Sequence, residues 1–146
     1  MDFDGYDQAE EFIQKGETRA AIHVGSQKFQ GNSKVVWYFR GDLFKSVDSE
    51  LAAMLGHYKG LLYAGQFDMI IPPSQTDEVV ASLKWDKLQD FQQAERKLWY
   101  VGGKLAGYRK SFHNLELAFV RRANHAVTGS QPEYLFDLVK KFCAYL

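Results

Sequence analysis

Cysteine is almost absent from this sequence, because Cys143 is the only one among its 146 residues. A single thiol can form neither an intrachain disulfide nor a cysteine-based zinc site. Taken alone, this usage is typical of a protein of the cytosol. Cys143 falls within an apolar helical pattern, so we expect it to be a buried structural thiol.

The sequence also lacks an excess of charge, because its 18 basic and 18 acidic residues cancel. Nucleic-acid-binding proteins usually show a basic excess or stripe, so no nucleic-acid partner is expected. No apolar run is long enough to cross a bilayer, and the acidic residues 1–6 have no apolar segment like that of a signal peptide. The composition, 46% hydrophobic and 15% aromatic, suits one globular domain or part of a larger one.

Two strands and the last helix are the clearest predicted elements. Leu61–Gly65 is apolar on both faces, which is typical of a strand covered by helices on both sides, and Leu115–Val120 has strong strand propensity. The last helix is predicted to start at a capping box, Ser130-Gln131-Pro132-Glu133. With the helices predicted over 46–57 and from Ser74 onward, the order is typical of the end of a doubly wound α/β sheet. Two parallel strands do not make a stable domain, so we expect more of the sheet upstream.

Shorter segments fill the rest of the chain. Residues 7–14 and 18–25 are predicted as short helices that end near glycine, whereas the apolar run Val35–Phe39 fits a helix or a strand. Asp90–Tyr100 fits either a helix or a pair of strands, and Leu105–Tyr108 fits a short strand. The tryptophans are expected in the core or in pocket walls: Trp37, Trp85 and Trp99.

An acid and a histidine stand just past the two clear strands. Asp68 follows the glycine that ends Leu61–Gly65, and His125 lies beyond Leu115–Val120. The carboxyl edge of a parallel sheet is where α/β enzymes keep their sites. The order Asp then His matches the later part of the Ser…Asp…His order of α/β hydrolases. We therefore predict that Asp68 and His125 are two members of a hydrolytic triad.

The third member of such a triad is missing from the sequence. Histidine would take the proton of a serine hydroxyl, while the carboxylate fixes the imidazole tautomer and stabilises the imidazolium. No Gly-x-Ser-x-Gly occurs, and Ser130, which follows a glycine directly, is better explained as a helix cap. The remaining histidines show no spacing typical of a metal site, so neither a metal nor a cofactor is expected: His23, His57 and His113.

Several segments, taken in their order and spacing, resemble one known family: Ala21–Gly25, Leu62–Asp68, Leu83-Lys84-Trp85, Trp99, Ala106-Gly107-Tyr108, Val120–His125 and Gln131-Pro132. From about Ala21 to Phe142 the chain resembles the C-terminal part of the serine carboxypeptidases, and most closely their vitellogenic-like branch. The resemblance implies that residues 1–146 are the C-terminal portion of a single α/β-hydrolase domain. It implies a mostly parallel sheet flanked by helices, which is incomplete in this chain.

The resemblance implies an exopeptidase that removes C-terminal residues from peptides or proteins in lysosomes, vacuoles or secretions. By position, Asp68 and His125 match the catalytic aspartate and histidine of the family. The nucleophilic serine would come from an N-terminal part or chain of the same enzyme, so the isolated chain is expected to be inactive. A homodimer is a further assembly that the sequence leaves open.

The same resemblance implies that the substrate pocket is bordered by Phe67, Ile71, Asn124 and Ala126. Many members have cysteine where Ile71 stands, and Gly-His-Met where this chain has Asn124-His125-Ala126. These departures put the specificity of the leaving-group pocket in question. They motivate a second hypothesis, a non-catalytic binding or scaffold protein of hydrolase descent.

Overall fold

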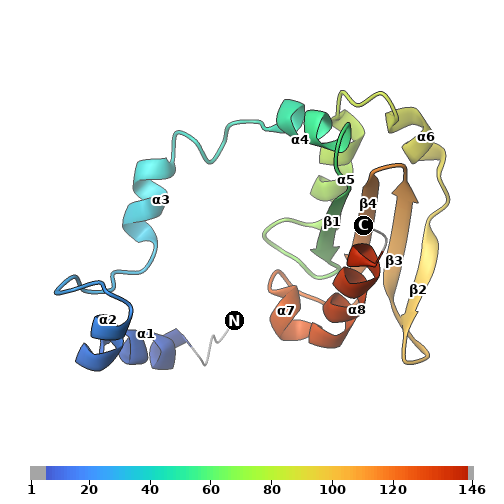
Figure 1. The fold of residues 1–146 in the computed structure, drawn as a ribbon. Helices are drawn as coiled ribbons and strands as arrows, with labels where there is room; N and C mark the ends of the chain where they lie inside the picture. The colour runs from blue at the N-terminus through green and yellow to red at the C-terminus, as the bar shows by residue number, and fades with distance from the viewer. Residues whose placement is uncertain (1–5, 145–146) are drawn as a thin grey trace. The chain divides into compact units, whose positions relative to one another are not determined.

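The computed structural model of the protein describes residues 6–144, which divide into two compact units (Figure 1). The N-terminal unit, residues 6–45, holds α1 (Tyr6–Gln14), α2 (Gly16–Ala21) and α3 (Ser33–Phe39). The sheet unit, residues 46–144, holds the other elements in this order: α4 (Asp48–Leu55), β1 (Gly60–Gly65), α5 (Pro73–Ser82), α6 (Leu88–Gln93), β2 (Lys97–Val101), β3 (Lys104–Phe112), β4 (Leu115–Val120), α7 (Val127–Ser130) and α8 (Pro132–Cys143). Among residues 6–144, none of the helices has the length and apolar character needed to span a membrane.

The sheet has the strand order β1-β4-β3-β2 (Figure 1). β1 and β4 are parallel, with Gly60 opposite Leu115 and Gly65 opposite Val120. The pairs β3–β4 and β2–β3 are antiparallel. The four strands of the described residues therefore form a mixed sheet, where the sequence predicts a mostly parallel one. The reason is local, because the turn after Val101 joins β2 and β3 as a hairpin, and a short connection permits only antiparallel pairing.

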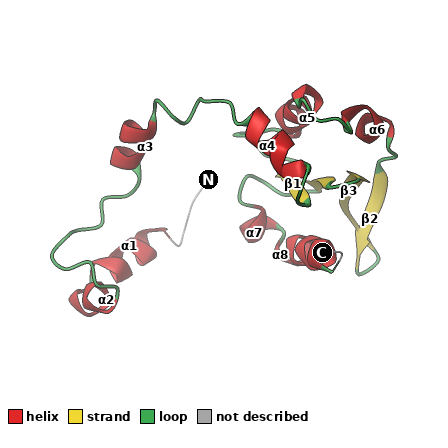
Figure 2. Cartoon of the chain, turned by 45° about the horizontal axis from the view of Figure 1, so that its top comes forward, coloured by secondary structure: helices red, strands yellow, loops and turns green. Residues whose placement is uncertain are grey.

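Helices cover both faces of the sheet (Figure 2). Along β4, Leu115 and Leu117 point into one buried cluster with residues of α4, α5 and α6. Ala118 and Val120, on the opposite face, pack in a second cluster with residues of α7 and α8. Alternate side chains of a strand point to opposite faces, so β4 is a central strand buried on both sides.

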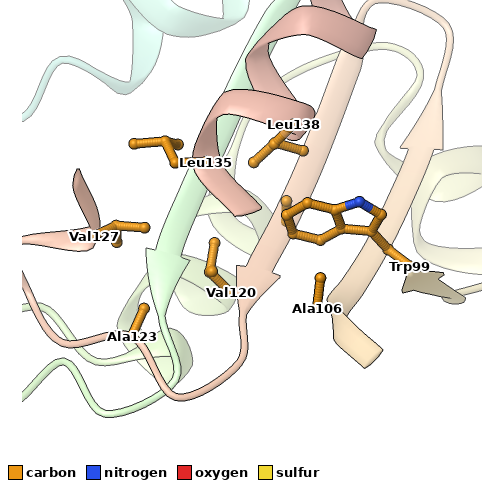
Figure 3. Close-up of a cluster of buried hydrophobic side chains, with 8 residues drawn as sticks. Trp99, Ala106, Val120, Ala123, Val127, Leu135 and Leu138 are labelled. Carbon is orange, nitrogen blue, oxygen red and sulfur yellow. The ribbon is translucent and has the colours of Figure 1, made fainter. Parts of the chain in front are cut away.

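A cluster of buried side chains packs α8 against the sheet (Figure 3). Trp99 of β2 is only 3% exposed and packs with Leu135 and Leu138. Its indole N–H donates a hydrogen bond of 2.7 Å to Asp137 Oδ2. The same carboxylate oxygen lies 2.8 Å from Lys141 Nζ. The buried tryptophan therefore has its one polar group satisfied, which removes the cost of burying it.

The N-terminal unit has no such cluster, since no residue from 8 to 45 is buried. Trp37 of α3 is 62% exposed, so its predicted place in the core or a pocket wall is wrong, whereas Trp85 and Trp99 are buried as predicted. The Arg40 guanidinium lies over the Trp37 ring at 3.9 Å from its centroid. It also donates a hydrogen bond of 2.7 Å to the Trp37 carbonyl. The Trp37 ring therefore packs against the Arg40 guanidinium and not against core side chains.

The last helix buries a narrower face than its sequence predicts. Leu135 and Leu138 are buried, but Val139 is 41% exposed and Cys143 is exposed. The predicted burial of Cys143 is therefore wrong. The reason is helical geometry, because Cys143 lies five residues after the buried Leu138, which turns its side chain roughly 140° away around the helix. Leu146, predicted on the buried face, lies outside the described residues.

Candidate active site

Two loops leave the same edge of the sheet. Because β1 and β4 are parallel and Gly65 lies opposite Val120, residues 66–72 and residues 121–126 follow strand ends that are neighbours. These loops carry Asp68 and His125. The edge is the carboxyl end of the parallel pair, where α/β folds place their sites.

The structure joins the two predicted triad residues directly. His125 Nδ1 lies 2.9 Å from Asp68 Oδ2. The second carboxylate oxygen, Oδ1, accepts hydrogen bonds from the Ile70 N–H at 2.8 Å and the Ile71 N–H at 2.9 Å. The Asp68 side chain is 6% exposed, while the His125 side chain is 45% exposed. The carboxylate is therefore held at both oxygens, and the imidazole remains open to solvent.

The surroundings of Asp68 keep it ionised. Burial alone raises the pKa of this carboxyl. Hydrogen bonds from the Ile71 N–H, the His125 ring and the Ile70 N–H, together with the charge of His125, outweigh burial and lower the pKa below its ordinary value of 3.8. An ionised carboxylate can only accept, so neutral His125 carries its proton on Nδ1. The Nε2 lone pair is then free to act as a general base.

A close approach of the two loops makes this contact possible. The Phe67 N–H donates to the Ala123 carbonyl at 2.8 Å, and the Gln66 N–H donates to the Val120 carbonyl at 2.8 Å. A Cβ atom at Gly65 would stand 2.3 Å from the Asn124 carbonyl oxygen, far inside van der Waals contact. Glycine at position 65 is therefore what lets the loop before His125 pass over the end of β1.

Ser130 supports the His125 loop instead of capping α8, so its predicted role as a cap is wrong. Its hydroxyl accepts a hydrogen bond of 3.2 Å from the Asn124 N–H and lies 3.2 Å from the Ala126 carbonyl oxygen, to which it donates. α8 begins after Gln131, with no side-chain hydrogen bond at its N-cap. The short helix α7 ends at Ser130 and turns its hydroxyl back toward the loop. No sequence signal separates the two roles, because both place a serine just before a helix.

The four residues expected at the substrate pocket flank the dyad on its two loops. Phe67 and Ile71 are 60% and 50% exposed, Ala126 is exposed and Asn124 is half-buried. The Asn124 Oδ1 atom is buried and has no hydrogen-bond partner among residues 6–144. The dyad thus lies between exposed apolar side chains and one unsatisfied amide oxygen.

A hollow of the sheet unit and a possible metal site are two alternatives to the position of the dyad. A hollow of about 720 Å³ in the sheet unit is lined by residues that include Asn114 and Leu115, at the start of β4. Asp68 and His125 follow the opposite ends of their strands and do not line it. In the part of the chain that the structure describes, no three histidine, cysteine, aspartate or glutamate side chains lie together as a metal site would require.

Comparison with known proteins agrees with the resemblance carried by the motifs. A family model described as serine carboxypeptidase matches residues 2–145. Similar proteins include the venom serine carboxypeptidase of Apis mellifera, 38% identical over 90% of this chain and 28% of the relative. The vitellogenic carboxypeptidase of Aedes aegypti is 32% identical over 90% and 29%. The probable serine carboxypeptidase CPVL of Homo sapiens is 31% identical over 90% and 28%.

The chain therefore spans less than a third of the length of these relatives. The family predicted from the motifs is confirmed, because its model covers nearly all of the chain. The chain belongs to the serine carboxypeptidase family.

Proposed function

We propose that residues 1–146 form the C-terminal portion of a serine-type carboxypeptidase and supply two members of its catalytic triad. The observation that carries this proposal is the 2.9 Å contact between His125 Nδ1 and Asp68 Oδ2, in a chain of the serine carboxypeptidase family. Asp68 is the orienting carboxylate and His125 is the base. Both units then belong to one α/β-hydrolase domain, which the upstream part of the protein completes.

In this mechanism His125 Nε2 takes the proton of a serine hydroxyl as the oxygen attacks the last peptide carbonyl of the substrate. Asp68 accepts the Nδ1–H bond and stabilises the imidazolium that forms. His125 then delivers the proton to the departing amine, and the C-terminal residue leaves. Water, activated by the same base, attacks the acyl-enzyme and restores the serine. The serine lies in an N-terminal part of the same enzyme.

Two features support assembly with the N-terminal part and binding of a substrate. β1 is an edge strand whose partner among the described residues is β4 alone, so a strand of the N-terminal part can extend the sheet from its free side. Phe67, Ile71, Asn124 and Ala126 border the pocket for the departing residue. An enzyme of this kind would work in lysosomes, vacuoles or secretions.

The proposal is tested with the purified 146-residue chain and with the complete protein. We expect the chain alone to hydrolyse no blocked dipeptide and to resist labelling by a fluorophosphonate, which reacts with activated serines. The complete protein should release the C-terminal residue, and His125→Ala should abolish that release. Hydrolysis by the chain alone that His125→Ala removes would overturn the need for an outside serine.

The departures at Ile71 and Ala126 favour a second candidate, a non-catalytic binding or scaffold remnant of a hydrolase. The hydrogen bonds around Asp68 favour the enzyme, because a remnant has no need for an ionised carboxylate held at both oxygens. The two candidates differ in one feature of the complete protein. An enzyme requires a Gly-x-Ser-x-Gly turn after a strand upstream of Met1, and a remnant does not.

A further inference from the structure

The turn between β4 and His125 contains an unusual backbone conformation. Arg122 has a φ of +57°, in the left-handed region that residues other than glycine rarely adopt. Two glutamine side chains hold the main chain of this residue. The Arg122 N–H donates to Gln66 Oε1 at 3.1 Å, and the Arg122 carbonyl accepts from Gln131 Nε2 at 3.4 Å.

The left-handed residue directs the chain toward Asp68. It lies three residues before His125, and the carbonyl that follows it, that of Ala123, accepts the Phe67 N–H at 2.8 Å. Gln66 contacts the turn through two groups. Its side-chain oxygen accepts from the Arg122 N–H, and its own N–H donates to the Val120 carbonyl at 2.8 Å. Gln66 stands two residues before Asp68 in sequence. One side chain therefore ties the loop of the carboxylate to the turn that aims the imidazole.

We infer that Gln66 is a positioning residue for the dyad. Its carboxamide oxygen holds Arg122 in the left-handed conformation, and that conformation places His125 Nδ1 against Asp68 Oδ2. Gln66 acts through the Arg122 peptide, while the dyad itself is made by the other two side chains. The inference rests on the proposed function for its catalytic meaning, but the geometry can be measured without activity.

The experiment uses the full chain with its four histidines labelled with nitrogen-15, and His125→Gln identifies the resonance of interest. At a pH where the ring is neutral, nitrogen shifts give the ratio of the Nδ1–H to the Nε2–H tautomer. Gln66→Met removes the acceptor and keeps the chain length. We expect the ratio to fall about five-fold, which corresponds to the net strength of one hydrogen bond. The control is Gln75→Met, at an exposed glutamine of α5, which should leave the ratio unchanged.

Two further variants test the route through Arg122. Gln66→Glu keeps an oxygen acceptor and should hold the ratio within about two-fold of the unmodified chain, since a net hydrogen bond is retained. Arg122→Gly makes a positive φ inexpensive, so the double variant Gln66→Met/Arg122→Gly should recover the original ratio. An unchanged ratio in Gln66→Met, or a loss that Arg122→Gly does not repair, would overturn the inference. If Gln66→Met alone does not fold, the double variant decides by the same criterion.

Activity of the complete protein separates this inference from the proposed function. Gln66→Met should lower kcat about five-fold and leave KM unchanged, because it disturbs the base and not substrate binding. If the tautomer ratio is insensitive to Gln66→Met while Asp68→Asn still abolishes activity, the role of Gln66 is rejected and the proposed function stands. If Gln66→Met shifts the ratio while Asp68→Asn leaves activity intact, the positioning role stands and the proposed function fails.

Discussion

The two units of this chain are both rich in large apolar residues but use them in opposite ways. In the N-terminal unit Trp37, Tyr38 and Phe44 are 62%, 81% and 91% exposed. In the sheet unit Trp99 and Leu138 are 3% and 0% exposed. A high content of apolar residues is therefore not sufficient to form a core. A sheet gives each strand two defined faces, and helices can pack against both.

The helices of the N-terminal unit are too short to be stable without a core. Its helices contain nine, six and seven residues, whereas isolated helices shorter than about 12–15 residues are marginal in water. Such helices need tertiary packing, and no side chain from residue 8 to 45 is buried. The sheet unit, in contrast, fixes the ends of β1 and β4 and so can hold two loops in register for chemistry.

The largest expected effect separates the two units of this chain by their roles in catalysis. In the complete protein, Asp68→Asn should lower kcat by about 10⁴-fold, because an amide stabilises the wrong imidazole tautomer. The matched change in the N-terminal unit, Asp42→Asn, should leave kcat unchanged, since the Asp42 carboxylate is exposed and pairs with the exposed Lys45. Steady-state kinetics on a blocked dipeptide measures both. Equal activity of Asp68→Asn and the unmodified enzyme would remove Asp68 from the triad.

The next effect tests the contrast between the two tryptophans. Trp99→Ala should lower the free energy of unfolding by about 3–5 kcal/mol, because it leaves a cavity under α8 and removes the indole hydrogen bond to Asp137. Trp37→Ala should change it by less than about 1 kcal/mol, the value of an exposed cation–π contact. Denaturant titration of the purified chain checks both. A Trp37→Ala loss as large as that of Trp99→Ala would mean that the N-terminal unit has a core of its own.

A smaller effect concerns the close approach at the end of β1. Gly65→Ala should cost roughly 1–3 kcal/mol in the free energy of unfolding, because its methyl group meets the Ala123 and Asn124 carbonyls. It should also move His125 away from Asp68. Gly129→Ala is the control, since a Cβ there meets no atom within 4 Å. Thermal unfolding compares the two variants, and equal melting temperatures would contradict the close approach.

The smallest effect is the dependence of stability on pH. The pKa of Asp68 is lowered by folding, so its contribution is fully present above about pH 3.8 and is lost as the pH falls through the lower folded value. Asp137, whose pKa is lowered by Lys141 and Trp99 against the effect of burial, contributes with the same sign. Acid titration of Asp68→Asn should therefore show a shallower loss of stability than the unmodified chain. An identical acid profile would show that Asp68 is not held as an ion in the folded chain.

Local patterns in the sequence predicted the elements that the structure contains at the site. The apolar run that became β1 and the strand that became β4 both carry short-range signals. Asp90–Tyr100 could not be assigned, because α6 and β2 share that stretch and each is too short for periodicity to separate. The capping prediction for Ser130 failed for a similar reason, since α7 is only four residues long.

Residue types and their spacing along the chain are sufficient to predict the family, the two strands and the order of Asp68 and His125. Three features appear only in the folded chain: the contact between Asp68 and His125, the hydrogen bonds of Ser130 and Gln66 to the loop before His125, and the exposure of Trp37 beside the burial of Trp99. These features join residues far apart in the chain or depend on which face of an element is covered. They follow from the register of β1 against β4 and from the packing of helices on the sheet, which no local pattern encodes.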